Sequence, residues 1–250
     1  MTGLLGALQF LTRVPIHLPR AVPHERVLPW FALAGALIGA AVGGVAVGLA
    51  EVVPTTVAGT LAVVAGLLIT GAFHEDGLAD VADAFGGGWT VDERLRILKD
   101  SRHGTYGVAA LAGSIVVRVF SVASIATSAA LFAAFVSAHT LGRAAAIAAL
   151  RMAPPASEAG LGVSARSDLR PWPTAIGQVA GVAVVVVVAG WWVGPFIAGA
   201  LIGTMATVWL AVRKIGGLTG DVLGAVEQVV ECTVMVIASG LARRHDVWWS

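Results

Sequence analysis

The sequence has little of the chemistry on which most soluble domains depend. Its one cysteine, Cys232, excludes an internal disulfide framework. Only 12% of the 250 residues are charged, whereas 57% are hydrophobic, and the mean hydropathy is +0.86. The chain also lacks a G-x-x-x-x-G-K-[ST] loop, a C-x-x-C pair and a G-x-S-x-G elbow. P-loop nucleotide hydrolysis and serine-elbow catalysis therefore have no support, and the composition is typical of a polytopic membrane protein.

Long apolar runs are abundant. A helix needs about 20 apolar residues to cross a hydrocarbon core of about 30 Å, and helices satisfy their own backbone hydrogen bonds there. Such runs lie at 29–49, 55–73, 105–123, 128–150, 173–193, 196–212 and 222–241. We therefore predict an all-α fold, an integral membrane helical bundle with about six or seven transmembrane helices, forming one catalytic domain over residues 1–250. The last run carries Glu227 and Glu231, so a tilted or re-entrant segment is an alternative there.

Basic residues are distributed unevenly among the connections. They cluster before the first run and after the second, fourth and sixth, and these segments fall on one side of the predicted membrane: Arg13, Arg20, Arg26, Arg94, Arg96, Lys99, Arg102, Arg151, Arg166, Arg170, Arg213 and Lys214. The connections at 51–54, 124–127 and 191–195 contain neither Lys nor Arg. The positive-inside rule places the segments 74–104, 151–172 and 213–221 on the cytoplasmic face of the cell membrane. Arg243 and Arg244 disagree with seven full spans.

Three aspartates stand between an apolar run and a glycine cluster. Asp76, Asp80 and Asp83 occupy positions i, i+4 and i+7, so a helix that starts near His74 presents them as one stripe. Three like charges repel, and a divalent cation relieves the repulsion. Hard carboxylate oxygens suit Mg²⁺ or Mn²⁺, so we predict that the three aspartates are metal ligands. The alternative is a membrane-surface helix with exposed carboxylates.

The stretch KDSRHGTYG, residues 99–107, has the composition of a phosphate site. Asp100 is predicted to complete the metal coordination, Arg102 to hold phosphate oxygens, and Gly104 and Gly107 to bring backbone amides to the ligand. Ser101 and the earlier His74 are predicted to contact the substrate as well. An ordinary juxtamembrane turn with a helix cap is the alternative.

A third cluster begins the last apolar run. In GGLTGDVLGAVEQVVE, residues 216–231, we predict substrate contacts for Thr219, Asp221 and Glu231. Asp221 could instead simply cap the helix. Glu231 lies ten residues further on, about 15 Å deeper by helical rise, where an unpaired carboxylate is costly. Its candidate partners are Arg118 and Arg143. Arg143 is also predicted to bind substrate, although a structural ion pair explains either arginine equally well.

The motifs together resemble the cobalamin-5′-phosphate synthase family, also called adenosylcobinamide-GDP ribazoletransferases. The resemblance covers most of the chain and lies in FLTRVP at 10–15, FHEDGLADVADAFGGG at 73–88, KDSRHGTYG at 99–107, GR at 142–143, EAGLG at 158–162 and GGLTGDVLGA at 216–225, followed by Glu231.

The resemblance implies an Mg²⁺-dependent membrane enzyme that completes the lower ligand of a corrinoid. Such an enzyme transfers the cobinamide phosphate moiety of adenosylcobinamide-GDP to α-ribazole, or to α-ribazole 5′-phosphate, and releases GMP. For this reaction we predict catalytic roles for Asp100 and Arg102, and for Asp83 as the base that accepts the hydroxyl proton. The expected partners are these small molecules and the lipid bilayer, with no nucleic acid. A homo-oligomer is left open.

Two other functions fit parts of the pattern. CDP-alcohol phosphotransferases also bind metal through an aspartate-rich helix at a bilayer face, but their D-x-x-D-G-x-x-A-R pattern is not present here. A cation or drug transporter would concentrate its acidic residues near the middle of the bilayer. Most of the acidic residues here fall instead in the motifs assigned to the cytoplasmic side.

Overall fold

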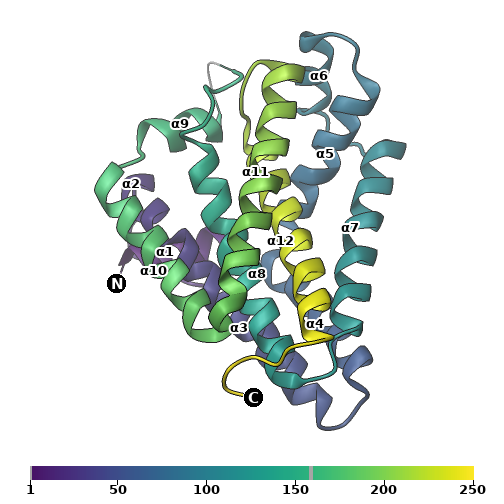
Figure 1. The fold of residues 1–250 in the computed structure, drawn as a ribbon. Coiled ribbons are helices and arrows are strands. Elements are labelled where there is room, and N and C mark those ends of the chain that lie inside the picture. Colours follow the sequence, from purple (N-terminus) through teal and green to yellow (C-terminus); the bar gives the residue numbers. More distant parts are fainter. Residues whose placement is uncertain (1, 158–159) are drawn as a thin grey trace.

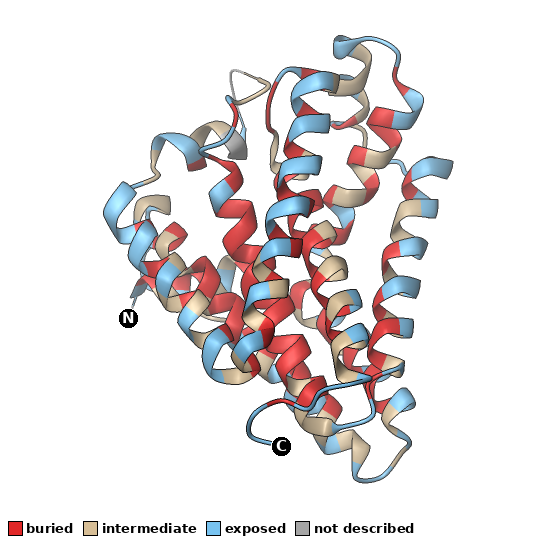
Figure 2. Cartoon of the chain, viewed as in Figure 1, coloured by how far each residue is buried: buried red, intermediate tan, exposed pale blue. Residues whose placement is uncertain are grey.

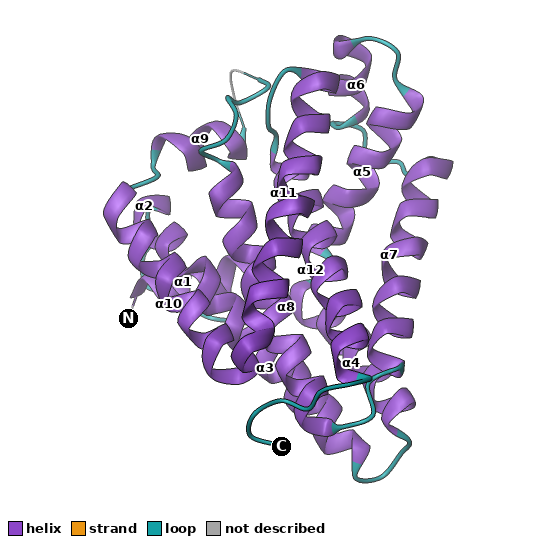
Figure 3. Cartoon of the chain, viewed as in Figure 1, coloured by secondary structure: helices purple, strands orange, loops and turns teal. Residues whose placement is uncertain are grey.

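A computed structural model describes residues 2–157 and 160–250, which form a bundle of helices (Figure 1). The helices are α1 Thr2–Leu11, α2 His24–Val27, α3 Phe31–Ala50, α4 Thr55–Thr70, α5 Phe73–Gly87, α6 Val91–Ile97, α7 Thr105–Ala123, α8 Ser128–Ala149, α9 Leu161–Ser167, α10 Pro171–Ala189, α11 Val193–Ile215 and α12 Gly220–Ala242, with the 3₁₀ turns η1 Leu28–Trp30 and η2 Gly190–Trp192. Figure 3 shows helices and loops but no strand among these residues. The predicted all-α fold is confirmed.

Among the described residues, five helical segments are long and apolar enough to cross a membrane, or six if the bent pair α4 and α5 counts as one broken span. One of the five is the continuous stretch Pro171–Ile215. Figure 1 shows that this stretch folds back at η2, so that α10 and α11 run from there toward the same end of the molecule. Taken separately, α10 and α11 match two of the predicted runs. The polytopic helical bundle is therefore confirmed.

The second predicted run ends earlier than expected. α4 stops at Thr70 because Gly71 and Ala72 both adopt left-handed backbone conformations, with φ of +67° and +55°. Glycine enters this region freely, whereas for alanine it is uncommon. The chain then turns through 88° into α5. This break separates the aspartate-bearing helix from the apolar run before it.

α8 lies at the centre of the bundle, and almost all of its residues are buried. Figure 2 shows the buried residues gathered in the middle of the bundle, with exposed residues around it. α3 crosses α8 closely through Gly35 and Gly39: a Cβ atom on Gly39 would lie 2.6 Å from the carbonyl oxygen of Phe135. Small residues allow such backbone approach between membrane helices.

The segments predicted to share one side of the membrane meet at one end of the bundle (Figure 1). The Leu218 amide donates to the Pro154 carbonyl at 2.8 Å, and Arg94 donates to the Lys214 carbonyl at 2.8 Å. These bonds join the α8–α9 connection, α6, the end of α11 and the α11–α12 connection. We call the described residues of the segments 91–104, 151–170 and 213–219 the basic end. Of the predicted motif at 158–162, residues 158 and 159 lie outside the described residues.

Candidate active site

The three predicted aspartates share helix α5, as expected, but their carboxylates differ in exposure. The Asp76 side chain is 63% exposed and the Asp80 side chain 14%, whereas Asp83 is buried. The difference arises because α7 and the loop before it cover the C-terminal half of α5. The stripe therefore divides into an accessible pair, Asp76 and Asp80, and an enclosed carboxylate, Asp83.

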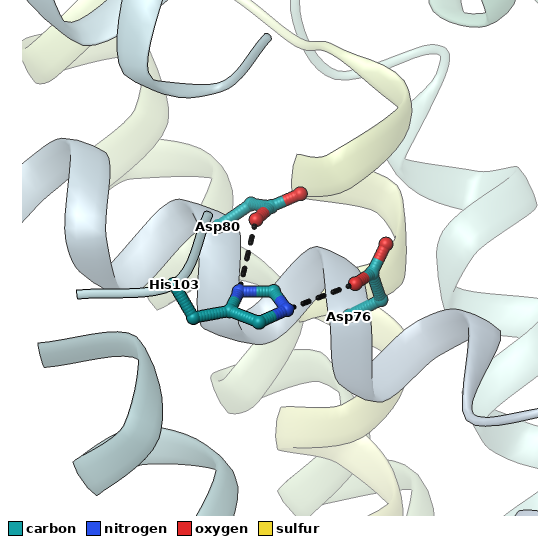
Figure 4. Close-up of side chains that lie close together, drawn as sticks. All are labelled: Asp76, Asp80 and His103. Atoms are coloured by element: carbon teal, nitrogen blue, oxygen red, sulfur yellow. Dashed lines mark ion pairs between the residues drawn. The ribbon is translucent and has the colours of Figure 1, made fainter. Parts of the chain in front are cut away.

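The accessible pair converges on His103, as Figure 4 shows. The imidazole Nε2 lies 3.5 Å from Asp76 Oδ1, and its Nδ1 lies 3.5 Å from Asp80 Oδ1. One potential ligand atom from each of the three residues falls within 4.8 Å of the other two. Two carboxylates and an imidazole in this arrangement can hold a divalent metal ion. We call Asp76 and Asp80 the acidic pair.

Asp83 has different partners. Its carboxylate accepts hydrogen bonds from the backbone amides of Gly104, at 2.6 Å, and Gly107, at 2.8 Å, and so caps the N-terminus of α7. A Cβ atom on Gly104 would lie 2.6 Å from Asp83 Oδ1, and one on Gly107 would lie 2.9 Å from the Ala79 carbonyl. The glycines thus let α7 approach α5. Their predicted amide contacts to substrate, and the predicted ligand and base roles of Asp83, stay predictions.

Asp100 and Arg102 form an exposed pair in the loop before α7. Arg102 donates from Nε to Asp100 Oδ1 at 3.0 Å and from Nη2 to Oδ2 at 2.7 Å. The hydrogen bonds from Arg102 hold the pKa of Asp100 at about 2, so this carboxylate is ionised at physiological pH. Both residues line a recess with Asp83 and His103. Ser101, between them, is exposed.

The N-terminus of α12 completes this end of the molecule. Thr219 caps the helix, because its hydroxyl oxygen accepts a hydrogen bond from the Val222 amide at 3.3 Å. That is the role considered above for Asp221, which instead lies in the first turn and accepts a hydrogen bond from Thr219 at 3.3 Å. Asp221 is near enough for its charge to act on Asp80. A third carboxylate thus adds to the negative potential around the acidic pair.

Deeper in the bundle, buried charges form an ionic centre. Glu231 is buried, and both of its carboxylate oxygens have a positively charged partner. Oε1 accepts a hydrogen bond from Arg118 Nη1 at 3.0 Å, and Oε2 accepts one from Arg143 Nη1 at 3.0 Å. Arg118 also donates to Glu75 at 2.8 Å, and Arg143 also donates to Glu227. The predicted pairing of Glu231 with both arginines is confirmed.

The ionic centre ties the site to the bundle. It comprises three carboxylates and two guanidinium groups from α5, α7, α8 and α12, all nearly fully buried: Glu75, Arg118, Arg143, Glu227 and Glu231. His139 joins it, with Nδ1 2.7 Å from Arg143 and 3.1 Å from Glu231. Since Glu75 directly precedes Asp76, the pairing with Arg118 fixes the rotation of α5. The predicted substrate contacts of Arg143 and Glu231 stay predictions.

Apart from Arg118, which was predicted only as a partner of Glu231, four residues of these clusters are not among the predicted site residues: His103, Glu75, His139 and Glu227. His103 lies inside the stretch 99–107, which was predicted to be a phosphate site, and this place in the sequence could have identified His103 as a site residue. Glu75 is about 100° around the helix from Asp76 and so falls outside the aspartate stripe. Glu227 lies one helical turn before Glu231, a spacing that places both on the same face of α12.

Comparison with known proteins covers almost the whole chain. A family model described as cobalamin-5-phosphate synthase matches residues 3–239. An adenosylcobinamide-GDP ribazoletransferase of Vibrio cholerae is 34% identical, over 97% of this chain and 95% of its own length. Enzymes of the same name from Chlorobaculum tepidum and Ralstonia pickettii are 34% and 36% identical over more than nine-tenths of each chain. No solved structure matches the chain.

Proposed function

The chain belongs to the cobalamin-5-phosphate synthase family, and from that membership we propose that it is an adenosylcobinamide-GDP ribazoletransferase. It transfers the cobinamide phosphate moiety of adenosylcobinamide-GDP to α-ribazole or its 5′-phosphate, and GMP is released. The main structural support for this reaction is that Asp76, Asp80 and His103 converge beside a loop that presents Arg102. This arrangement suits a diphosphate better than it suits a transported cation, because it lies at one end of the bundle and not midway along it.

The reaction exchanges one phosphorus–oxygen bond for another. The ribose 3′-hydroxyl of the acceptor attacks the phosphorus nearer the cobinamide, the bond from that phosphorus to the GMP oxygen breaks, and GMP leaves with the bonding electrons. The hydroxyl proton passes to a base. We assign this role to Asp83, which lines the recess with Arg102 and has an orientation fixed by two amide hydrogen bonds. A carboxylate retains free lone pairs after accepting two hydrogen bonds.

Arg102 stabilises the developing charge. Asp100 holds its guanidinium group through Nε and Nη2. Among the described residues, Arg102 Nη1 has no hydrogen-bond partner, so this nitrogen is available for a phosphate oxygen. A guanidinium group aligned in advance loses less conformational entropy when the substrate binds. Positioning and charge stabilisation account for most of the catalysis in phosphoryl transfer.

A divalent cation is part of this proposal. Asp76, Asp80 and His103 would hold it, and when bound it neutralises the charge of the diphosphate. Mg²⁺ is the proposed ion. Because imidazole also suits transition metals, Mn²⁺ should replace Mg²⁺ well at this set of ligands. The basic end, with its arginines and lysines, is proposed to face the cytoplasm, following the positive-inside rule.

Release of GMP by purified protein in detergent tests the proposal. We expect turnover that needs both substrates and a divalent cation, and a loss of about 100-fold in Asp76→Asn and in Asp80→Asn. Asp92→Asn, an exposed aspartate at the start of α6, is the matched control and should retain wild-type activity. Near-normal turnover with unchanged metal dependence in Asp80→Asn would refute the metal site. Substrate-independent uptake of cations into liposomes would favour a transporter.

A further inference from the structure

An apolar pocket lies at the N-terminal end of α5. Phe73 and His74 line it, and His74 stands about 200° around the helix from Asp76. The pocket lies among α1, α3, α5, α8 and α12. Its walls are mainly aromatic and aliphatic side chains, including Phe10, Phe31, Phe73, Ala146, Ile147 and Leu223. The fold thus places an apolar pocket at the same end of the bundle as the charged site.

The aromatic rings of the pocket form a connected cluster. The Phe10 ring centroid lies 5.6 Å from that of Phe31 and 5.6 Å from that of Phe73, which it meets edge-on. Phe73 in turn meets the His74 ring edge-on at 5.1 Å. The four rings contact one another and also line the pocket, so they offer an aromatic wall. Such a wall favours a planar aromatic ligand, which gains from stacked and edge-on contacts.

Few polar side chains reach the pocket. Arg143 lines it but is bound to Glu227 and Glu231. The side chain of His24 is 41% exposed and pairs with Asp168 at 3.5 Å. Among the described residues, His74 is the remaining polar residue of the lining, and its Nδ1 lies 3.7 Å from Glu227 Oε2. A guanine ring, which carries several donors and acceptors, would leave most of them unpaired here, at a cost for each. The pocket therefore suits a ring system with little polar surface.

α5 and the N-terminus of α12 lie between the pocket and the acidic pair. They touch where Gly77 meets α12: a Cβ atom on Gly77 would lie 2.8 Å from the Asp221 carbonyl and 3.3 Å from the Gly224 Cα. Gly220 lines the pocket, and the next residue, Asp221, packs against Gly77, the neighbour of Asp76. The separation is about one helix diameter, roughly 10 Å, comparable to the length of a nucleoside.

We propose that this pocket binds the aromatic base of the acceptor nucleoside, and that it selects a bicyclic base with little polar surface over a purine. The inference rests on the proposed function, since it names the place of one substrate. With its base held there, the nucleoside extends over the N-terminus of α12, past Thr219 and Asp221, and its ribose approaches the acidic pair with His103.

Filling the pocket tests the inference. Ala146→Leu adds three carbon atoms inside it, and Ala148→Leu adds the same atoms at an exposed position of the same helix. Equilibrium dialysis of labelled α-ribazole against detergent-solubilised protein, without donor, measures binding directly. We expect Ala146→Leu to weaken this binding at least tenfold, and Ala148→Leu to match the wild type. In turnover, only the acceptor KM should rise, while the KM of the GDP-linked donor stays unchanged.

The outcomes separate the two proposals. Wild-type GMP release tests the function irrespective of the pocket. Suppose that the wild type releases GMP, and that Ala146→Leu has a wild-type melting temperature and binds α-ribazole as tightly as the wild type does. The pocket inference is then overturned, and the proposed function stands. If Ala146→Leu does not fold, Leu223→Ala, which removes a wall of the pocket, must show the weaker acceptor binding. A co-purified lipid acyl chain that α-ribazole does not displace would also overturn the inference.

Discussion

Arg102 and Asp100 illustrate how an exposed residue can be prepared for a reaction. The arginine side chain is 87% exposed, so its pair with Asp100 adds little to stability. The pair instead restricts the guanidinium group to one orientation at the edge of the recess. That orientation is useful only if an anion binds there. A phosphate group would bind there, because a cation held by the neighbouring carboxylates would attract it.

We therefore expect Arg102→Ala to lower kcat more than it raises KM, because a contact that strengthens as GMP leaves acts mainly in the transition state. Arg102→Lys keeps the charge but loses the planar group, so it should recover the activity only partly. Steady-state kinetics of GMP release measures both. Arg20→Ala, an exposed arginine outside the site, is the control. An unchanged kcat in Arg102→Ala would remove Arg102 from the reaction.

Arg118 represents the opposite case, a buried charge. Its replacement by methionine leaves Glu75 without its only hydrogen-bond partner among the described residues and removes one partner of Glu231. Removing one member of a buried ion pair costs about 3–5 kcal/mol. Arg118→Met should therefore melt at a clearly lower temperature in detergent, and the double variant Arg118→Met/Glu75→Gln should recover part of the loss. Arg20→Met is the exposed control, and equal melting of Arg118→Met and the wild type would contradict the argument.

Single residues differed in how far the sequence determined their roles. The partners of Glu231 could be predicted because an apolar chain contains few cations deep enough to reach it. The contacts of Asp83 could not, because spacing along a helix places a side chain on a face but does not say which neighbouring helix will cover it. His103 was missed for a related reason: its approach to Asp76 and Asp80 depends on how the loop before α7 folds over α5.

At the scale of elements, glycine positions decide which helices come close together. On α3, Gly39 faces the backbone of α8, whereas a Cβ atom on Gly44 would meet nothing within 4 Å. We expect Gly39→Ala to destabilise the protein by about 1–3 kcal/mol, because two backbones must separate. Gly44→Ala should be neutral or slightly stabilising, since alanine favours the helix.

Thermal melting of the two variants in the same detergent measures this difference. The pair is well matched, because the substitution and the helix are the same and only the facing surface differs. If both variants melted like the wild type, α3 and α8 would not be packed as closely as described.

The helices themselves were largely predictable from runs of apolar residues, and each predicted run lies on a helix. The break at Gly71 and Ala72 was not predictable in the same way. Hydropathy measures whether a segment prefers lipid, and it does not register that two residues adopt left-handed backbone conformations and turn the chain. The direction of α5, and with it the orientation of the acidic pair, follows from that turn.

At the scale of the whole molecule, the loops of the basic end should all be labelled from one side of the membrane. In a Cys232→Ala background, cysteine at Ser101, Ser167 or Thr219 should react with an impermeant reagent from the cytoplasmic side. Cysteine at Thr127, in the connection after α7, should react only from the other side. Opposite labelling of Ser101→Cys and Thr219→Cys would contradict the topology, because these residues belong to the same end of the bundle.

The ionic centre has a consequence for how the protein is made. Synthesis starts at the N-terminus, so Arg118 and Arg143 enter the membrane before the ribosome has reached Glu227 and Glu231. Until then Glu75 is the only carboxylate of the centre to have emerged, and two guanidinium groups stand beside it in a nascent bundle, where unpaired charge is costly. α12, which is synthesised after both arginines, supplies the missing carboxylates. The ionic centre can therefore be completed only once α12 has been made.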